Sequence, residues 1–256
     1  PTKINLYFST KEKKCLTKDF RILGANHINS GLTFFKFRET SPIITTVYRN
    51  EEMMKVIIHE LIHNYKYDFG FLEFNLKLSD FLNLSKDTKI TPNESYTEIV
   101  ALLLNTIVES YNFKKSGNYE LFKVMLNYEV QFNLLQCARI LKYYQFNSAA
   151  DFFQPYDNKN RFKQNTNVFS YFFMKTALLL NTTELFDFFE RYSNNFFLKR
   201  GNVYYIKSVY EKLIVKSLKR PQFKNGIEHF FKKLGKGRGF DSPKELCKTL
   251  RMTIFG

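Results

Sequence analysis

The first candidate for chemistry is a His-Glu-x-x-His pattern formed by His59, Glu60 and His63 within a run of helical periodicity. Side chains four positions apart lie on one face of a helix, about 6 Å apart along its axis. Two imidazoles at this spacing can bind one zinc ion, and Glu60 lies beside the same face, within reach of a water molecule on the metal. The pattern therefore predicts a zinc site with Glu60 as the general base for hydrolysis of a peptide bond.

A helix must position this motif, and the flanking residues suit one. We expect it to begin after Asn50, a favourable N-cap residue, with Glu51 and Glu52 in the first turn, where the helix dipole favours negative charge. Apolar residues form a stripe beside the histidine face that we expect to be buried: Met54, Ile58, Leu61, Ile62 and Tyr65. The alternative, two core histidines satisfied by hydrogen bonds, is disfavoured because two of only four histidines fall in this one arrangement.

A third ligand is expected on a second helix, because a catalytic zinc takes three protein ligands and leaves one position for water. Pro92 stands near the first turn of that helix, which is predicted to run to about Phe113. It carries Glu94 and Glu98, one turn apart on the same face. One acid would bind zinc and the other would accept the free N–H of a liganding histidine, and the spacing leaves their order open.

Residues 93–98, Asn-Glu-Ser-Tyr-Thr-Glu, resemble the Asn-Glu-x-x-Ser-Asp pattern of the gluzincins, a family that includes thermolysin. In that family the first acid binds zinc and the second contacts the histidine. The resemblance implies that Glu94 is the ligand and that Glu98 orients the histidine, with Glu where the family has Asp.

A wider resemblance covers roughly the first 110 residues, in ordered blocks at 28–31, 48–52, 55–63 and 94–98. In these blocks the chain is similar to the His-Glu-x-x-His metallopeptidases encoded by large nucleocytoplasmic DNA viruses. This similarity implies a gluzincin-like fold and a place in the cytoplasm of an infected cell or in a virion. It implies no particular substrate.

The fold predicted from these elements is α+β and zincin-like. Short strands are expected at 4–8, 32–37 and 43–48, with residues 29–37 as an edge strand along a cleft. The strands and the two metal-bearing helices would form a catalytic core over residues 1–115. A mostly helical lobe over residues 116–256 would complete the cleft, with helices at 118–146, 167–181, 183–194 and 204–219.

Several further residues are candidates for smaller roles. Zincins usually stabilise the oxyanion with a Tyr, His or Arg from the C-terminal lobe, and Tyr204 is preferred here over Arg200 and His229. We expect His27 to be a turn residue near the surface. Arg49 is expected to pair with Glu51 or Glu52 and to have no catalytic role.

The composition sets limits on partners and on cellular location. The net charge of +15 is spread along the chain, which predicts weak association with nucleic acid or a virion through a basic surface, but no sequence-specific recognition. The three cysteines, Cys15, Cys137 and Cys247, are far apart, which favours a reducing compartment and argues against a disulfide framework. With no membrane-length apolar run and no signal-like start, a soluble cytoplasmic protein is expected.

The leading hypothesis is therefore a zinc-dependent peptidase acting on peptides or proteins, with a role in viral protein processing. Two hypotheses from other classes compete with it. One is a structural or scaffolding virion protein that retains the fold. The other is a basic factor associated with nucleic acid, which would bind DNA or RNA even when His59 is mutated.

Overall fold

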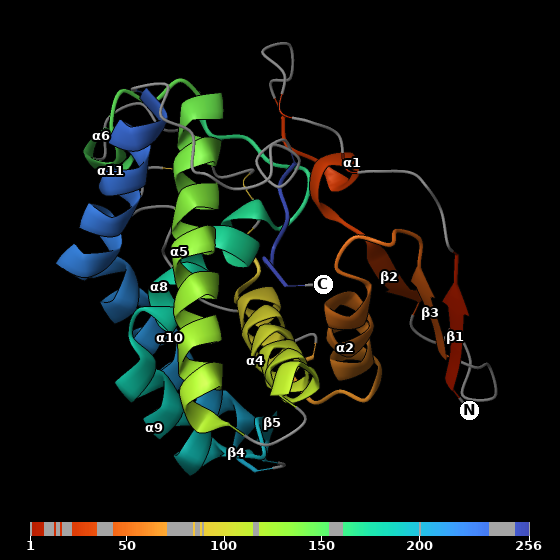
Figure 1. Ribbon diagram of the computed structural model, residues 1–256. Helices are drawn as coiled ribbons and strands as arrows, with labels where there is room; N and C mark the ends of the chain where they lie inside the picture. Colours follow the sequence, from red (N-terminus) through yellow and green to blue (C-terminus); the bar gives the residue numbers. More distant parts are fainter. Residues whose placement is uncertain are drawn as a thin grey trace.

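A small mixed sheet lies at one side of the molecule (Figure 1). The computed structural model describes residues 2–7, 13, 16, 22–34, 43–70, 84, 88, 90–114, 118–153, 161–199, 201–235 and 249–255. The strands β1 (Thr2–Leu6), β3 (Ile43–Val47) and β2 (Gly31–Phe34) lie in that order, with β1 parallel and β2 antiparallel to β3. In the described sheet β2 is thus an edge strand, as the sequence predicted, while residues 35–37 of that prediction lie outside the described part of the chain.

The rest of the described chain is mostly helical, so the fold is α+β. The elements that follow the sheet strands or lie between them are α1 (Ala25–Ile28), α2 (Met53–Asn64), α4 (Pro92–Lys114), α5 (Tyr119–Tyr143), α6 (Ala149–Phe153), the π-helix η1 (Phe169–Met174), α8 (Lys175–Leu179), α9 (Thr182–Tyr192), the hairpin β4 (Ser193–Asn194) and β5 (Phe197–Leu198), α10 (Val203–Lys219) and α11 (Pro221–Gly235). The predicted helical stretches are confirmed to within a few residues, and η1 with α8 fills the stretch predicted at 167–181.

The elements are stacked in layers, with α2 between the sheet and α4, and α5 beyond α4 (Figure 1). The middle of helix α4 is covered on all sides, and its segment Ile99–Leu103 has no exposed surface. This explains its continuous apolar sequence, because a helix that is hydrophobic all round is a buried one. The same core cluster continues through α5, η1 and α8 to α11. No helix in the described ranges is long and apolar enough to cross a membrane.

The start of α2 differs from the prediction. The helix begins at Met53, and its N-cap is Glu52 in a left-handed conformation (φ 61°), not Asn50. The Glu52 carboxylate does not face solvent in the first turn. It forms a buried ion pair with Lys13 and accepts the backbone N–H of Thr253 at 2.7 Å. These partners are distant in the sequence, so the local N-cap preferences of residues 50–52 could not indicate them.

The predicted buried stripe of α2 is partly wrong. Ile62 is buried, but Met54 and Tyr65 are 46% and 51% exposed. Because α2 is covered by the sheet on one side and by α4 on the other, its buried face also includes Val56 and Glu60. A single apolar stripe describes a helix with one packed face, and α2 has two.

Two smaller expectations near the sheet are also corrected. His27 is buried rather than close to the surface, and its Nδ1 accepts the backbone N–H of Gly24 at 3.2 Å. Arg49 donates to the carbonyl oxygens of Asn29 at 2.6 Å and Asn26 at 3.0 Å, so it joins α1 to the turn before α2 instead of pairing with the neighbouring glutamates.

Candidate metal centre

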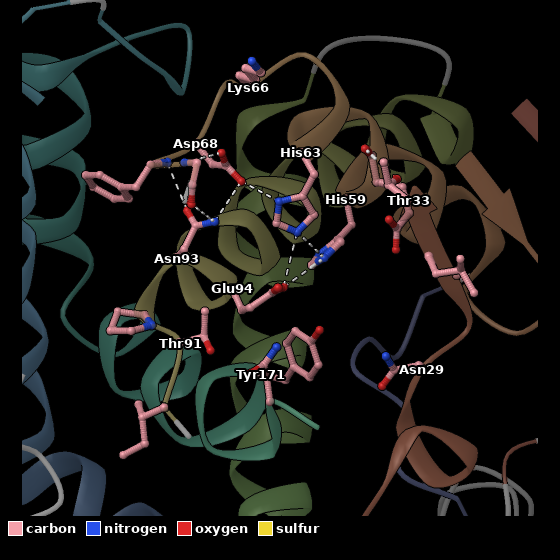
Figure 2. A pocket seen from close by; sticks show the side chains of 18 of the residues that line it. Asn29, Thr33, His59, His63, Lys66, Asp68, Thr91, Asn93, Glu94 and Tyr171 are labelled. Carbon is pink, nitrogen blue, oxygen red and sulfur yellow. Dashed lines mark hydrogen bonds and ion pairs between the residues drawn. The ribbon is translucent and has the colours of Figure 1, made fainter. Parts of the chain in front are cut away.

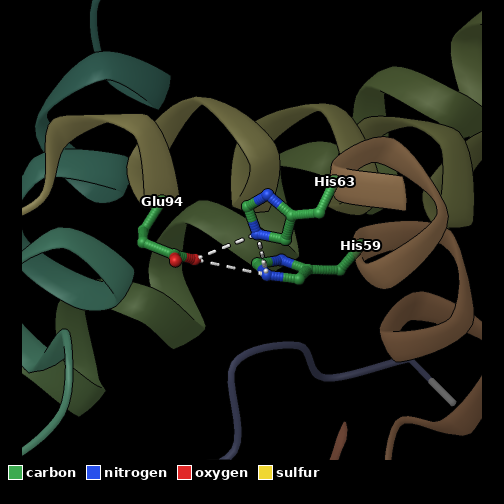
Figure 3. Close-up of side chains that lie close together, drawn as sticks. All are labelled: His59, His63 and Glu94. Atoms are coloured by element: carbon green, nitrogen blue, oxygen red, sulfur yellow. Dashed lines mark hydrogen bonds and ion pairs between the residues drawn. The ribbon is translucent and has the colours of Figure 1, made fainter. Parts of the chain in front are cut away.

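Three side chains from two packed helices converge on one point (Figure 3). His59 and His63 project from α2, and Glu94 projects from the first turn of α4. The two Nε2 atoms are 3.1 Å apart, and Oε2 of Glu94 is 3.3 Å from each of them. Residues predicted from separate segments of the sequence thus form one group.

The chemistry of this group fits a metal ion. Zinc binds His nitrogen and carboxylate oxygen at about 2.0–2.2 Å, and tetrahedral ligands at that radius are roughly 3.3 Å apart. The distances among the three donor atoms, 3.1 and 3.3 Å, agree with this spacing. Two histidines and one glutamate are also a ligand set found in catalytic zinc sites, where a fourth position is left for water. The group could therefore hold a metal ion.

The outer nitrogen of each histidine contacts its own carboxylate. Nδ1 of His59 lies 2.9 Å from Oε1 of Glu98, and Nδ1 of His63 lies 2.5 Å from Oδ2 of Asp68. An ionised carboxylate only accepts hydrogen bonds, so Nδ1 of His63 carries the proton, and the nearby Glu98 carboxylate favours a proton on Nδ1 of His59 as well. With the protons on Nδ1, the Nε2 lone pairs of both rings are directed at the same point. In metal sites this arrangement fixes the orientation of the ring and makes the histidine a better ligand.

The carboxylate oxygens of Glu98 also contact two lysine side chains. Nζ of Lys55 donates to them at 2.7 and 2.8 Å, and Nζ of Lys175 lies 3.5 Å from Oε2. All three of these side chains are almost fully buried. Burial alone would raise the pKa of the Glu98 carboxyl, but the two lysines hold it well below its usual value.

Asp68, which sequence reasoning missed, makes a different set of contacts (Figure 2). Its Oδ2 accepts from the Asn93 side chain at 3.1 Å and from the Thr97 hydroxyl at 3.3 Å, and its Oδ1 accepts the backbone N–H of Gly70 at 2.8 Å. Its place five residues after His63, just beyond the end of α2, is the one signal in the sequence that could have suggested it.

The electrostatics of the group favour positive charge. Burial tends to lower the pKa of His63, but its hydrogen bonds to Asp68 and Glu94 raise it well above the ordinary value. The pKa of His59 is raised in the same way, against burial, by Glu94 and Glu98. Burial opposes ionisation of Glu94 as well, yet the two histidines lower its pKa far below the usual range. A site that holds ionised acids around two imidazoles attracts a cation.

The group lies at the wall of a cavity of about 1120 Å³. Gly31, Leu32 and Thr33 of β2 line one side, and the predicted base Glu60, itself buried, lines the cavity next to the histidines. A backbone of strand conformation thus borders the same space as the metal-binding group.

Two tyrosines from the C-terminal half also line this cavity. Tyr204, the predicted oxyanion donor, lies in the first turn of α10 and is 71% exposed. Tyr171, which the sequence did not single out, is buried on η1, with its ring centre 6.1 Å from that of His59 (Figure 2). π-Helical turns occur frequently at functional sites. Of the other two candidates, His229 is exposed on α11, and Arg200 lies outside the described residues.

Comparison with known proteins gives one distant relative. The chain is 28% identical over 157 residues to an uncharacterised protein of Acanthamoeba polyphaga mimivirus. The match covers 59% of this chain but only 39% of the relative, so the chain spans well under half of that protein's length. No protein-family model and no solved structure matches the chain. The chain therefore has a distant viral homologue but no assigned family.

Proposed function

We propose that this protein is a zinc-dependent peptidase with a zincin-like fold, and that His59, His63 and Glu94 hold the metal. The observation that carries the proposal is the convergence of two Nε2 lone pairs and one carboxylate oxygen at the wall of a cavity that Glu60 also lines. The mimivirus relative supports a viral setting, in an infected cell's cytoplasm or in a virion, and the resemblance to viral metallopeptidases supports a role in viral protein processing.

Glu94 is preferred over Glu98 as the third ligand because of what each acid contacts. Oε2 of Glu94 lies 3.3 Å from both Nε2 atoms. Glu98 is on the opposite side of the His59 ring, next to Nδ1, and its oxygens already accept from lysines. Glu98 is therefore suited to orient His59, as the gluzincin resemblance implies.

The bound zinc ion would lower the pKa of a water molecule and polarise the carbonyl of the scissile peptide. Glu60, which lines the cavity beside the histidines, would serve as the general base for a water molecule and would pass the proton to the leaving amine. Tyr171 is suited to donate a hydrogen bond to the carbonyl oxygen, because burial, together with Glu94 and Glu98, raises its pKa well above the usual value and keeps it protonated. The edge of β2, whose residues Gly31 to Thr33 line the cavity, would pair with the backbone of the substrate.

The test combines elemental analysis with cleavage of a peptide library. Glu60→Gln should retain zinc and lose hydrolysis by roughly 10²–10⁴-fold, the usual contribution of a general base. His63→Ala should lose zinc. Unchanged turnover by Glu60→Gln would remove the assigned base and with it this mechanism.

The two tyrosines can be separated by matched variants. Tyr171→Phe and Tyr204→Phe each remove one hydroxyl and keep the ring. If Tyr171 is the donor, Tyr171→Phe lowers kcat while Tyr204→Phe, at an exposed position, changes KM at most. The reverse result would restore the assignment of Tyr204 that the sequence suggested.

A further inference from the structure

Three lysines are buried among three glutamates behind the metal-binding group. Lys13, Lys55 and Lys175 have at most 2% of their surface exposed, and Glu52, Glu98 and Glu129 at most 1%. Lysine is almost never fully buried unless it is paired. Burial of a charged pair is costly and seldom adds stability by itself, so such a cluster calls for a reason other than stability.

The partners of Lys55 and Lys175 supply that reason. Both ammonium groups contact Glu98, and Glu98 contacts Nδ1 of His59. Lys55 lies one helical turn before His59 on α2, and Lys175 comes from α8. These contacts hold the Glu98 carboxylate beside Nδ1 of His59.

Lys175 is in turn fixed by the segment of residues 249–255, which lies between the start of α2 and α5 (Figure 1). Nζ of Lys175 donates to the carbonyl oxygen of Met252 at 2.8 Å. Glu52 accepts the N–H of Thr253 at 2.7 Å, and Glu129 accepts the N–H of Ile254 at 3.2 Å. Side chains from α2, α5 and α8 thus hold the backbone of this segment in place.

We propose that Lys55, Lys175 and the segment 249–255 form a clamp that positions Glu98, and through Glu98 fixes the His59 ring for metal binding. The lysines are positioning residues, because neither contacts the metal-binding atoms themselves. The clamp rests on the metal site of the proposed function and does not depend on peptidase activity. Its effect should appear in metal affinity and not only in folding.

Lys13 offers a matched control for Lys175. Each is a fully buried lysine that pairs with a buried glutamate and donates to a carbonyl of the same segment, Leu250 in the case of Lys13. The partner of Lys13 is Glu52, which is not in contact with His59. Lys13→Met and Lys175→Met therefore remove the same chemistry, but only the second removes a contact to Glu98.

Zinc affinity of the full chain, measured by competition with a chelating indicator, tests the clamp. Lys175→Met should bind zinc more weakly, by at most the roughly 10–100-fold that loss of the Glu98 contact itself would cost, and Lys13→Met should bind within about twofold of the wild type. Urea unfolding of both variants reports their stabilities separately. Equal losses of zinc affinity in the two variants would overturn the clamp.

Lys175→Met leaves the buried negative charge of Glu98 with only part of its positive partners, and this variant could fail to fold for that reason. A double-mutant cycle covers this case. In a Glu98→Gln background the acid is already neutral, so adding Lys175→Met should leave zinc affinity unchanged. A further tenfold loss in that background would mean that Lys175 does not act through Glu98, and would overturn the clamp.

Failure of the wild type to bind zinc overturns the clamp and the proposed function together, whereas tight zinc binding without peptide cleavage overturns the peptidase alone.

Discussion

Replacement of Gly31 by alanine tests how closely β2 is packed against the helix that carries Glu60. A Cβ added at Gly31 would lie 2.6 Å from Cγ1 of Val56, 3.2 Å from the carbonyl oxygen of Thr46 and 3.3 Å from Cγ of Glu60. Carbon atoms in contact are ordinarily about 3.5–4.0 Å apart. The strand and the helix would therefore have to separate by roughly 1 Å.

The neighbours of Gly31 cannot easily relieve this contact. Val56 is only 3% exposed and β-branched, and a helical valine has one strongly preferred rotamer. The oxygen of Thr46 belongs to the backbone of β3. Overpacking of this kind costs about 1–3 kcal/mol, and for a chain of this size that corresponds to a Tm lower by roughly 2–12 °C. Since Glu60 is among the displaced groups, hydrolysis should fall while zinc stays bound.

Gly24→Ala is the matched control, because a Cβ at Gly24 would meet only Cβ of Asn165, at 3.8 Å. Urea unfolding of both variants and of the wild type measures the difference directly. We expect Gly24→Ala to unfold within about 1 kcal/mol of the wild type, on either side. If Gly31→Ala unfolded at the same urea concentration as Gly24→Ala, the close contact between β2 and α2 would be refuted.

Three further predictions concern other parts of the chain. Asp68→Asn should weaken zinc binding roughly 10–100-fold in a chelator competition, because it replaces the charged acceptor of the His63 Nδ1 proton by a neutral amide. Burial raises the pKa of Glu129 from 4.5 to about 7, so its stabilising effect is complete below pH 4.5 and is lost as the pH rises through 7, by on the order of 3 kcal/mol. Urea unfolding at pH 4.5 and pH 8 measures this fall in the free energy of unfolding, which the wild type should show and Glu129→Gln should lack. Lys66→Gly should raise the free energy of unfolding by about 1 kcal/mol, because Lys66 has a left-handed φ of 54°, and an unchanged urea midpoint would contradict this.

The grouping of His59, His63 and Glu94 could be predicted because local geometry determines much of their placement. Helical spacing puts His59 and His63 on one face, and it puts Glu94 near the start of a second helix. Local geometry does not determine how α2 packs against α4, but the buried apolar run after Glu98 favours that packing. The small sheet was predictable for a similar reason, because the β-branched run at 43–47 has a strong strand preference.

The residues that support this group could not be predicted, because their partners are distant in the sequence. Lys55 reads as an ordinary exposed lysine on a helix, yet it is buried against Glu98. Tyr171 lies in a run of aromatic residues where nothing local distinguishes the one that faces the cavity. Helix α11 was not predicted, although its first residue, Pro221, is of a type well tolerated in the first turn of a helix.

The two histidines are held by carboxylates in different electrical surroundings, and this difference bears on how a metal binds. The charge of Glu98 is shared with two lysines, whereas among the described residues Asp68 accepts hydrogen bonds, besides that of His63, from neutral groups. Asp68 therefore acts on His63 with its full negative charge, in agreement with the stronger rise of the His63 pKa. A proton and a metal ion compete for the same Nε2 lone pair. Zinc affinity should thus increase as the pH rises through the pKa of His63, and Asp68→Asn should flatten that dependence more than Glu98→Gln does.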